Sequence, residues 1–442
     1  MKYLAHLALA AGVAAAGDLT LDEAIQQALK ANPKVQNAAL ESAKLEARKS
    51  SLRTQLRPTT RVYALGAQPL APFDFTIDKG SLGTDVNGEP LPASDAKFQN
   101  SARPIGVAAV TVTEPLSQIP SIRREVRIAD LEKEIAQEQS RLERQNLVRD
   151  VRQLYYGIQS LDSALRAAQE GVRLSQEVVR ITAEYAAKRQ VLDVEYLEAQ
   201  MHLARFNETV LDLEDQRETL KTKLNHKMGR DISTEFTVPA IPESSESGTS
   251  AERGDLALAE QRAVAQRPEV RQVHLKVEQA KLELSNAAAA FDPTIAAELI
   301  GADLLNVTPL LPKRVGAAGV TVTWEPFTWG RKKHELEEKR DGIQQAMNLE
   351  KEVAGQVKVD VAEQVRRLEL SAAKLRVASL SRQMATESLR IAQKQYEAQY
   401  SLLKTVLEAQ VNLENAGADY RRILTELWTA RAEYDRALGE DQ

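Results

Sequence analysis

An internal duplication is the feature that most constrains the fold of this chain. The segment 21–33 is repeated as 256–268. Its last residue, Pro33, matches Pro268 at an offset of 235 residues, and a second proline, Pro58, matches Pro293 at the same offset. Three later matches share a shorter offset of 210 residues: 110–113 with 320–323, 197–200 with 407–410, and Gly229 with Gly439. Because the matches keep one order, the sequence predicts two structural repeats, 17–239 and 255–442, joined by a linker, 240–254.

Two long segments of the chain are free of proline and have a coiled-coil pattern. Proline is absent from 121–238 and from 327–442, although the chain has 16 prolines. Apolar residues recur there in alternating steps of four and three, from Leu402 to Tyr434 and from Leu192 to Leu224, where only Arg217 interrupts. This period predicts paired helices. The helix expected from about 115 to 188 would be roughly 110 Å long at 1.5 Å per residue.

Between the helical segments, each repeat has two short runs rich in β-branched residues. The expected strands are 59–68 and 104–113 in the first repeat, and 294–302 and 315–324 in the second. Each run has about the 9–11 residues that a tilted membrane strand needs. In the last strand of each repeat, apolar residues alternate with threonines, although alternation is weak in the first strand. We therefore expect one face toward lipid and one toward a lumen.

Four strands per chain are too few to close a barrel, and open sheet edges are not stable in lipid. Two copies would give about eight strands, whose interior is filled by side chains, whereas three copies would give about twelve strands with room for a pore. We therefore expect a mixed α/β membrane protein. Its fold would be a trimeric 12-stranded β-barrel, with four strands per chain, continuous with a long α-helical coiled-coil tunnel.

The remaining composition indicates export and gives no support to catalysis. Lys2, an apolar stretch and the small residues 14–16 predict a signal peptide at 1–16. Cysteine is absent, which excludes disulfides, thiolate zinc sites and a cysteine nucleophile. A net charge of −5 gives no reason to expect nucleic acid as a partner. The histidines are isolated and no nucleotide-binding or hydrolase motif is present, so we expect no enzyme activity, no cofactor and no metal.

Several motifs carry a resemblance to a known family: the helix opening 21–33, the strand-to-helix passages 113–116 and 323–330, and the two Leu-Glu-Ala-Gln stretches. In this order within a duplication, the chain resembles the TolC-type outer-membrane efflux proteins (outer membrane factors) over nearly its whole length. The resemblance implies a homotrimer in the outer membrane, with its helical tunnel in the periplasm. It also implies a passive conduit of a tripartite efflux or type I secretion system, which docks a periplasmic adaptor fed by an inner-membrane pump.

An alternative is a periplasmic coiled-coil adaptor or scaffold protein. That class would explain the heptad pattern, because an adaptor also carries a helical hairpin. It would explain neither the four strands of membrane length nor the duplication. We therefore keep the adaptor as the second interpretation of the sequence.

The resemblance also implies residues at the periplasmic entrance of the tunnel. Acidic residues narrow this entrance in the family, and the matching positions here are Thr405 and Glu408, with Glu195 and Glu198 in the first repeat. Three copies of Glu408 around a pore would favour cations, but glutamate is also ordinary on the solvated side of a coiled coil. The tip turns of the family, which contact the adaptor, usually carry glycine. Here those positions are Arg189 and Gln399.

Basic and aromatic residues gather where each predicted barrel segment passes into a long helix. Positive charge in a first helical turn opposes the helix dipole, so another interaction should favour it. Anionic lipid headgroups would do so, with aromatic side chains as anchors at the membrane interface; a solubilising surface is the alternative. The residues are Arg123, Arg124 and Arg127, then Trp324, Phe327 and Trp329, and finally Arg331, Lys332 and Lys333.

Overall fold

The computed structural model describes residues 18–71, 74–99, 104–189, 192–239, 256–306, 312–398 and 400–440. The expected signal peptide at 1–16, the expected linker at 240–254 and Gln399 lie outside these residues. The chain divides into two compact units. The helical unit comprises Met1–Ser42, Glu134–Leu275 and Met347–Gln442, and the sheet unit comprises Ala43–Lys133 and Lys276–Ala346.

The helices of the two repeats match in order and nearly in length. The bounds in the first repeat are α1 (Leu21–Ala31), α2 (Pro33–Thr54), α3 (Ile119–Ala187) and α4 (Asp193–Lys227). Those in the second are α5 (Leu256–Gln266), α6 (Pro268–Ala289), α7 (Arg331–Glu397) and α8 (Leu403–Ala437). The matched pairs have 11 and 11, 22 and 22, 69 and 67, and 35 and 35 residues. Among the described residues, no helix combines the length and the apolar character that crossing a membrane requires.

The two glycines at matching positions end α4 and α8 in the same way. Gly229 and Gly439 have φ values of 66° and 78°, a left-handed conformation that glycine adopts without a Cβ penalty. A Cβ on Gly229 would lie 3.0 Å from Ala31 Cβ, and one on Gly439 would lie 3.1 Å from the Arg267 backbone nitrogen. Each helix therefore ends in close contact with the short-helix junction of its own repeat.

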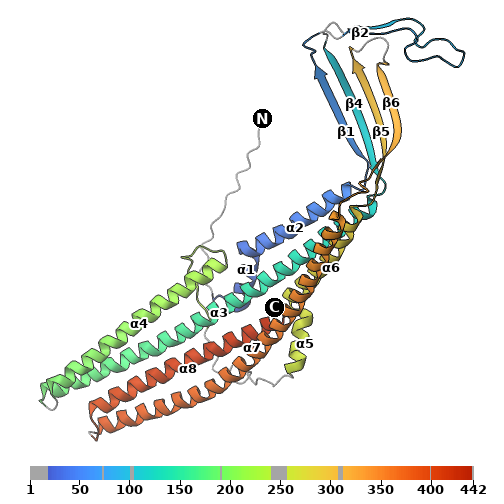
Figure 1. Ribbon diagram of the computed structural model, residues 1–442. Coiled ribbons are helices and arrows are strands. Elements are labelled where there is room, and N and C mark those ends of the chain that lie inside the picture. Colours follow the sequence, from blue (N-terminus) through green and yellow to red (C-terminus); the bar gives the residue numbers. More distant parts are fainter. Residues whose placement is uncertain are drawn as a thin grey trace, which may run out of the picture. The chain divides into compact units, whose positions relative to one another are not determined.

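Within the helical unit, α3 and α4 form one helical hairpin, and α7 and α8 form the other (Figure 1). The core of the first hairpin includes Val151 and Ile158 of α3 and Leu224 of α4, each fully buried. In the second, Leu368 of α7 packs in one cluster with Leu427 and Ala430 of α8. The apolar steps of four and three thus supply the surface on which each hairpin closes.

The two hairpins also contact each other. One buried cluster combines Val178 of α3 and Ala199 of α4 with Leu403 and Leu407 of α8. All four side chains are less than a tenth exposed. The first turn of α8 is therefore packed against the end of the other repeat's hairpin.

The strands form one antiparallel four-stranded sheet that both repeats supply. The strands are β1 (Thr59–Ala67), β4 (Ile105–Pro115), β5 (Thr294–Leu305) and β6 (Arg314–Thr323), in the order β1-β4-β5-β6. The sequence predicts 59–68, 104–113, 294–302 and 315–324 for them. The centre of the sheet is the pair β4 and β5, which joins the repeats at positions such as Val110 opposite Gly301. β2 (Asp74–Ile77) pairs with β3 (Ala96–Gln99) in the longer loop of the first repeat.

The register of the sheet separates an apolar face from a more polar one. Val112 lies opposite both Thr60 and Leu299, and Leu299 lies opposite Ala318. The same face carries Val62, Val110, Val320 and Val322, which are between 43% and 73% exposed. Residues one step along each strand face the other way, and there the Thr321 hydroxyl donates a hydrogen bond of 3.0 Å to Glu298 Oε2. A large apolar surface thus remains open to the surroundings of this chain.

Candidate functional site

The free ends of the two hairpins carry the residues predicted for a periplasmic entrance. The hairpin ends of the two repeats begin their second helices alike: the backbone N–H of Glu195 donates to the Leu192 carbonyl, and that of Thr405 to the Leu402 carbonyl, both at 3.0 Å. In the turn between α3 and α4, Arg189 is exposed and has a φ of 56°. An arginine therefore occupies a left-handed position that favours glycine.

The predicted entrance residues lie in the first two turns of α4 and α8. Glu408, Thr405 and Glu198 are exposed, and Glu195 is half-buried. The sequence argument missed Lys404, whose Nζ lies 3.8 Å from Glu408 Oε1 across one helical turn. The spacing of four residues was a signal for this pair. Lys404 offsets part of the negative charge that Glu408 brings to this surface.

Two tyrosines at the ends of the long helices meet close to these acids. The ring centroids of Tyr185 on α3 and Tyr396 on α7 are 6.5 Å apart, with an angle of 57° between the ring planes. Burial raises the pKa of Tyr396, and the charge of Glu195 adds to this shift. The structure makes Tyr396 a contact between the two hairpins.

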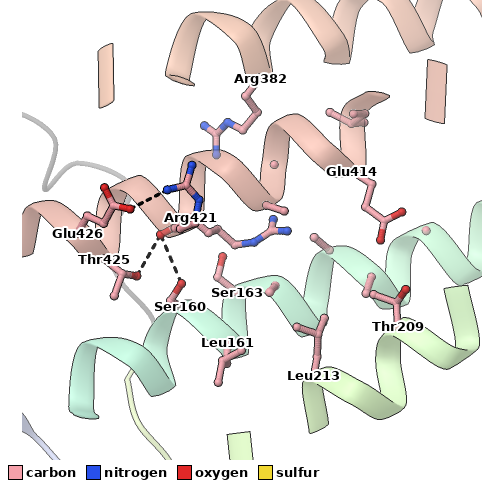
Figure 2. Close-up of a pocket in the computed structure, with 18 of the residues that line it drawn as sticks. Ser160, Leu161, Ser163, Thr209, Leu213, Arg382, Glu414, Arg421, Thr425 and Glu426 are labelled. Atoms are coloured by element: carbon pink, nitrogen blue, oxygen red, sulfur yellow. Dashed lines mark hydrogen bonds and ion pairs between the residues drawn. The ribbon is translucent and has the colours of Figure 1, made fainter. Parts of the chain in front are cut away.

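A cavity of about 1450 Å³ lies between the hairpins, further from their ends. Figure 2 shows that all of α3, α4, α7 and α8 contribute to its wall, with Leu161 and Leu213 on one side and charged residues of α8 on the other. Burial lowers the pKa of Arg421 and raises that of Glu414, and each charge partly offsets this effect on the other. This surface is therefore amphipathic and partly shielded from water.

Two contacts between the repeats lie near one end of this cavity. The Ser160 hydroxyl on α3 donates to the Arg421 carbonyl at 3.5 Å, and the Thr425 hydroxyl donates to the same oxygen at 3.0 Å (Figure 2). Beyond this point, the rings of Tyr156 on α3 and Trp428 on α8 have centroids 5.1 Å apart. The hairpins are thus held together at this end of the cavity.

The predicted aromatic anchors are all exposed in the sheet unit. Trp324, Phe327 and Trp329 have exposed fractions of 58%, 78% and 99%, and Trp329 also has a positive φ of 49°. Side chains of this size gain about 1.5–3 kcal/mol from burial. Their exposure therefore favours an apolar or interfacial surrounding at this part of the unit.

The predicted basic residues around these anchors are held in different ways. Arg124 is tied within the unit, because its Nε donates to Asn286 Oδ1 at 2.6 Å, and Arg127 pairs with Asp130 at 3.0 Å. Arg331 forms an ion pair with Glu325. The guanidinium of Arg331 and the ammonium group of Lys332 each lie 5.6 Å from the ring centroid of Phe291. Arg123 and Lys333 are exposed. The structure therefore leaves some of the basic group for a partner and uses the rest internally.

Nothing in the described residues suggests a metal centre, since no group of three or more potential ligands is placed to hold an ion there. Comparison with models of known protein families gives no match, and comparison with curated proteins gives none either. Solved structures do match. CusC, known from a study of its folding and transmembrane channel formation, is 14% identical, with a TM-score of 0.79 over 96% of this chain and 93% of that chain.

Two further outer-membrane proteins have a similar likeness to this chain. The Campylobacter jejuni outer-membrane channel CmeC is 15% identical, with a TM-score of 0.77 over 95% of this chain and 85% of that chain. The Vibrio cholerae outer-membrane protein VceC is also 15% identical, with a TM-score of 0.74 over 95% of this chain and 96% of that chain. This chain therefore has the fold shared by CusC, CmeC and VceC, with long helices and few strands.

Proposed function

We propose that this chain is one subunit of a homotrimeric outer-membrane channel-tunnel that conducts cargo passively from the periplasm to the outside. It would serve a tripartite efflux or type I secretion system. The observation that carries this proposal is the sheet. It has one exposed apolar face, and among the described strands β1 and β6 have a neighbour on one side only.

The geometry of the sheet supports closure between copies. Because all pairs are antiparallel and the number of strands is even, β6 of one copy would meet β1 of the next in an antiparallel pair. Three copies would then give about twelve strands with the apolar face toward lipid and the threonine-bearing face toward a lumen. The exposed tryptophans fit an aromatic belt at the membrane interface.

The helical unit fits a tunnel that docks partners in the periplasm. The likeness to the outer-membrane channels supports an adaptor fed by an inner-membrane pump as the partner. The turns at Arg189 and Gln399 would contact that adaptor. Glu195, Glu198, Thr405 and Glu408 would line the entrance, and Arg123, Arg124, Arg331, Lys332 and Lys333 would face lipid headgroups beside Trp324, Phe327 and Trp329.

The test is the location and assembly of the full chain. Outer membranes are extracted with detergent, and the chain is run on gels with and without heating, then reconstituted in planar bilayers. We expect a heat-sensitive trimer and stepwise conductance. Val320→Pro removes a backbone donor from the edge strand β6, so this variant should lose the trimer and the conductance while keeping its helical circular dichroism. A monomeric periplasmic protein without conductance would overturn the proposal and favour an adaptor or scaffold.

A further inference from the structure

A second cavity in the helical unit, of about 620 Å³, is lined by an excess of arginines. Its wall comes from α1, α2, α3 and α8 and includes five arginines but only two carboxylates, Asp435 and Glu440. We call it the arginine pocket; its arginines are Arg141, Arg144, Arg149, Arg152 and Arg436. None of the entrance residues described above belongs to it.

Three of these arginines have partners within the chain. Arg149 pairs with Asp150 at 2.7 Å, and Arg436 pairs with Asp360 at 3.3 Å. Both also approach Glu433, at 3.6 Å and 3.0 Å. Arg141 donates hydrogen bonds to the carbonyls of Gln266, at 2.9 Å, and Gly439, at 3.1 Å, where α5 and α8 end. These three side chains therefore hold the walls of the pocket together.

The other two arginines are less fully paired than these three. Arg144 has no hydrogen bond or ion pair among the residues that the structure describes, and its side chain is exposed to the pocket side of α3. Arg152 lies 3.7 Å from Asp435, and its Nε is buried without a hydrogen-bond partner in the same described part of the chain. A buried donor without a hydrogen-bond partner lowers the stability of the fold, and more so when it is charged. An anion in the pocket would remove this cost.

The positions of these two arginines suit one ligand between them. Arg144, Val148 and Arg152 are spaced by four residues, so they share one face of α3, and all three line the pocket. The two arginines are about 12 Å apart along the helix axis at 1.5 Å per residue. Val148 is only 6% exposed and forms an apolar floor between them. Both arginine side chains therefore line the pocket beside this apolar floor.

Guanidinium groups bind oxyanions through two parallel N–H donors, which gives both charge and geometric match. We propose that the arginine pocket binds a small oxyanion through the phosphate or carboxylate groups of the ligand, with Arg144 and Arg152 as the principal contacts. The hydroxyl of Ser140 and the amide of Gln137 are on the same wall and supply further hydrogen-bonding groups. This site lies outside the entrance and does not depend on the proposed channel function.

The experiment uses the full chain purified in detergent, with inorganic phosphate and succinate as separate probes and sodium chloride to keep the ionic strength equal. Binding is measured by calorimetry and by the shift in thermal unfolding. The test variant is Arg144→Gln with Arg152→Gln. The matched control is Arg173→Gln with Arg205→Gln, which removes the same charge from two exposed positions of α3 and α4.

We expect saturable binding of at least one probe by the wild type and the control, and at least tenfold weaker binding by the test variant. Preference for phosphate or for succinate would distinguish the two ligand classes. If the glutamine variant does not assemble, Arg144→Lys with Arg152→Lys keeps the charge but loses the paired donors, and should bind several-fold more weakly. Equal binding by all variants, or only a linear effect that chloride reproduces, would mean an adventitious ion only and overturn the proposal.

Discussion

The side-chain amide of Gln410 on α8 donates a hydrogen bond of 3.0 Å to the Ser175 hydroxyl on α3, and a second of 3.2 Å to the Gly171 carbonyl. Gln410 is only 4% exposed. The matching glutamine of the first repeat, Gln200, is exposed and donates only to the Tyr196 hydroxyl one turn away on its own helix. One motif residue therefore joins the two hairpins in the second repeat and does not in the first.

This difference predicts unequal effects of the same substitution. Gln410→Ala removes two hydrogen bonds between the hairpins, each worth about 0.5–1.5 kcal/mol, and also leaves a small void. We expect the ends of the hairpins to separate more readily, which would raise the conductance of the reconstituted protein. Gln200→Ala is the control and should leave single-channel conductance unchanged. Equal conductance of wild type and Gln410→Ala would show that this contact does not hold the entrance.

Close packing of α3 on α4 depends on Gly171. A Cβ there would lie 2.6 Å from Phe206 Cε1, and Phe206 is only 4% exposed, so its ring would have to shift toward the cavity that it lines. Gly171→Ala should therefore lower the free energy of unfolding by about 1–3 kcal/mol through overpacking. Adding Phe206→Leu should recover part of this loss. The measurement is the midpoint of chemical unfolding followed by circular dichroism.

Gly355 on α7 provides the matched control, because a Cβ there would have no neighbour within 4 Å. Gly355→Ala should stabilise the helix by up to about 1 kcal/mol. If both alanine variants changed the free energy of unfolding alike, helix propensity alone would explain the result, and the contact with Phe206 would contribute nothing.

The turn at Arg189 stores strain that glycine would release. Its φ of 56° costs a side-chain-bearing residue about 1–2 kcal/mol. Arg189→Gly should therefore slow hydrogen exchange at the ends of α3 and α4. Lys188→Gly places glycine at the neighbouring exposed position, where the backbone still bonds to Glu184 at 3.2 Å, and should speed exchange. Faster exchange in Arg189→Gly would contradict the strain argument.

A buried ion pair should make the helical unit sensitive to acid. Burial raises the pKa of Asp360, but the hydrogen bond and charge of Arg267 outweigh it, so the net pKa lies below the usual range. A carboxyl with a depressed pKa stabilises the fold above its ordinary pKa of about 3.9, and this contribution is lost as the pH falls through the folded value. The melting temperature should therefore fall steeply below about pH 4.

Asp360→Asn tests this pair directly. Arg267 is 6% exposed and its Nη1 lies 2.5 Å from Asp360, so the variant leaves a buried charge with fewer partners and should lose about 3 kcal/mol at pH 7. Its stability should also change less with pH in the acid range. Asp419→Asn, in an exposed pair with Arg422, should change neither quantity. A wild-type acid dependence in Asp360→Asn would assign the effect to other carboxyls.

The pairing of Lys404 with Glu408 predicts opposite effects on ion selectivity. In the proposed trimer, three copies of Glu408 would face the entrance, so Glu408→Gln should lower cation selectivity. Lys404→Gln should raise it, because the neighbouring positive charge 3.8 Å away is removed. Reversal potentials under a salt gradient measure both. Unchanged potentials in the two variants would place this pair outside the conduction path.

The helices were predictable because their apolar pattern persists over many turns. The ends of the strands were less predictable. β4 continues to Pro115 and β5 to Leu305, although the added residues include Glu114 and Asp303, which are poor strand formers. Pairing between the repeats extends them, since Pro115 lies opposite Ala296 and Gly106 opposite Leu305. Local propensity carries no information about a partner strand from the other repeat.

The candidate sites divide in the same way. Counting along matched motifs places Glu408 and Arg189 at the hairpin ends, and the four-residue spacing to Lys404 is visible in the sequence. The partners of Gln410 are not, because Ser175 lies on another helix 235 residues earlier. Likewise, Arg144 and Arg152 have an ordinary helical spacing, and it takes the approach of α1, α2 and α8 to turn that face into a pocket.

The two ends of the four-stranded sheet are unlike, because β1 comes from the first repeat and β6 from the second. In the proposed ring, β6 of each subunit would pair with β1 of the next, so the order of subunits around the ring has a direction. A mutant copy with a blocked β6 could still join through β1 and then stop the next addition. Such an allele would prevent closure of rings that also contain normal subunits, and its effect would therefore be dominant rather than recessive.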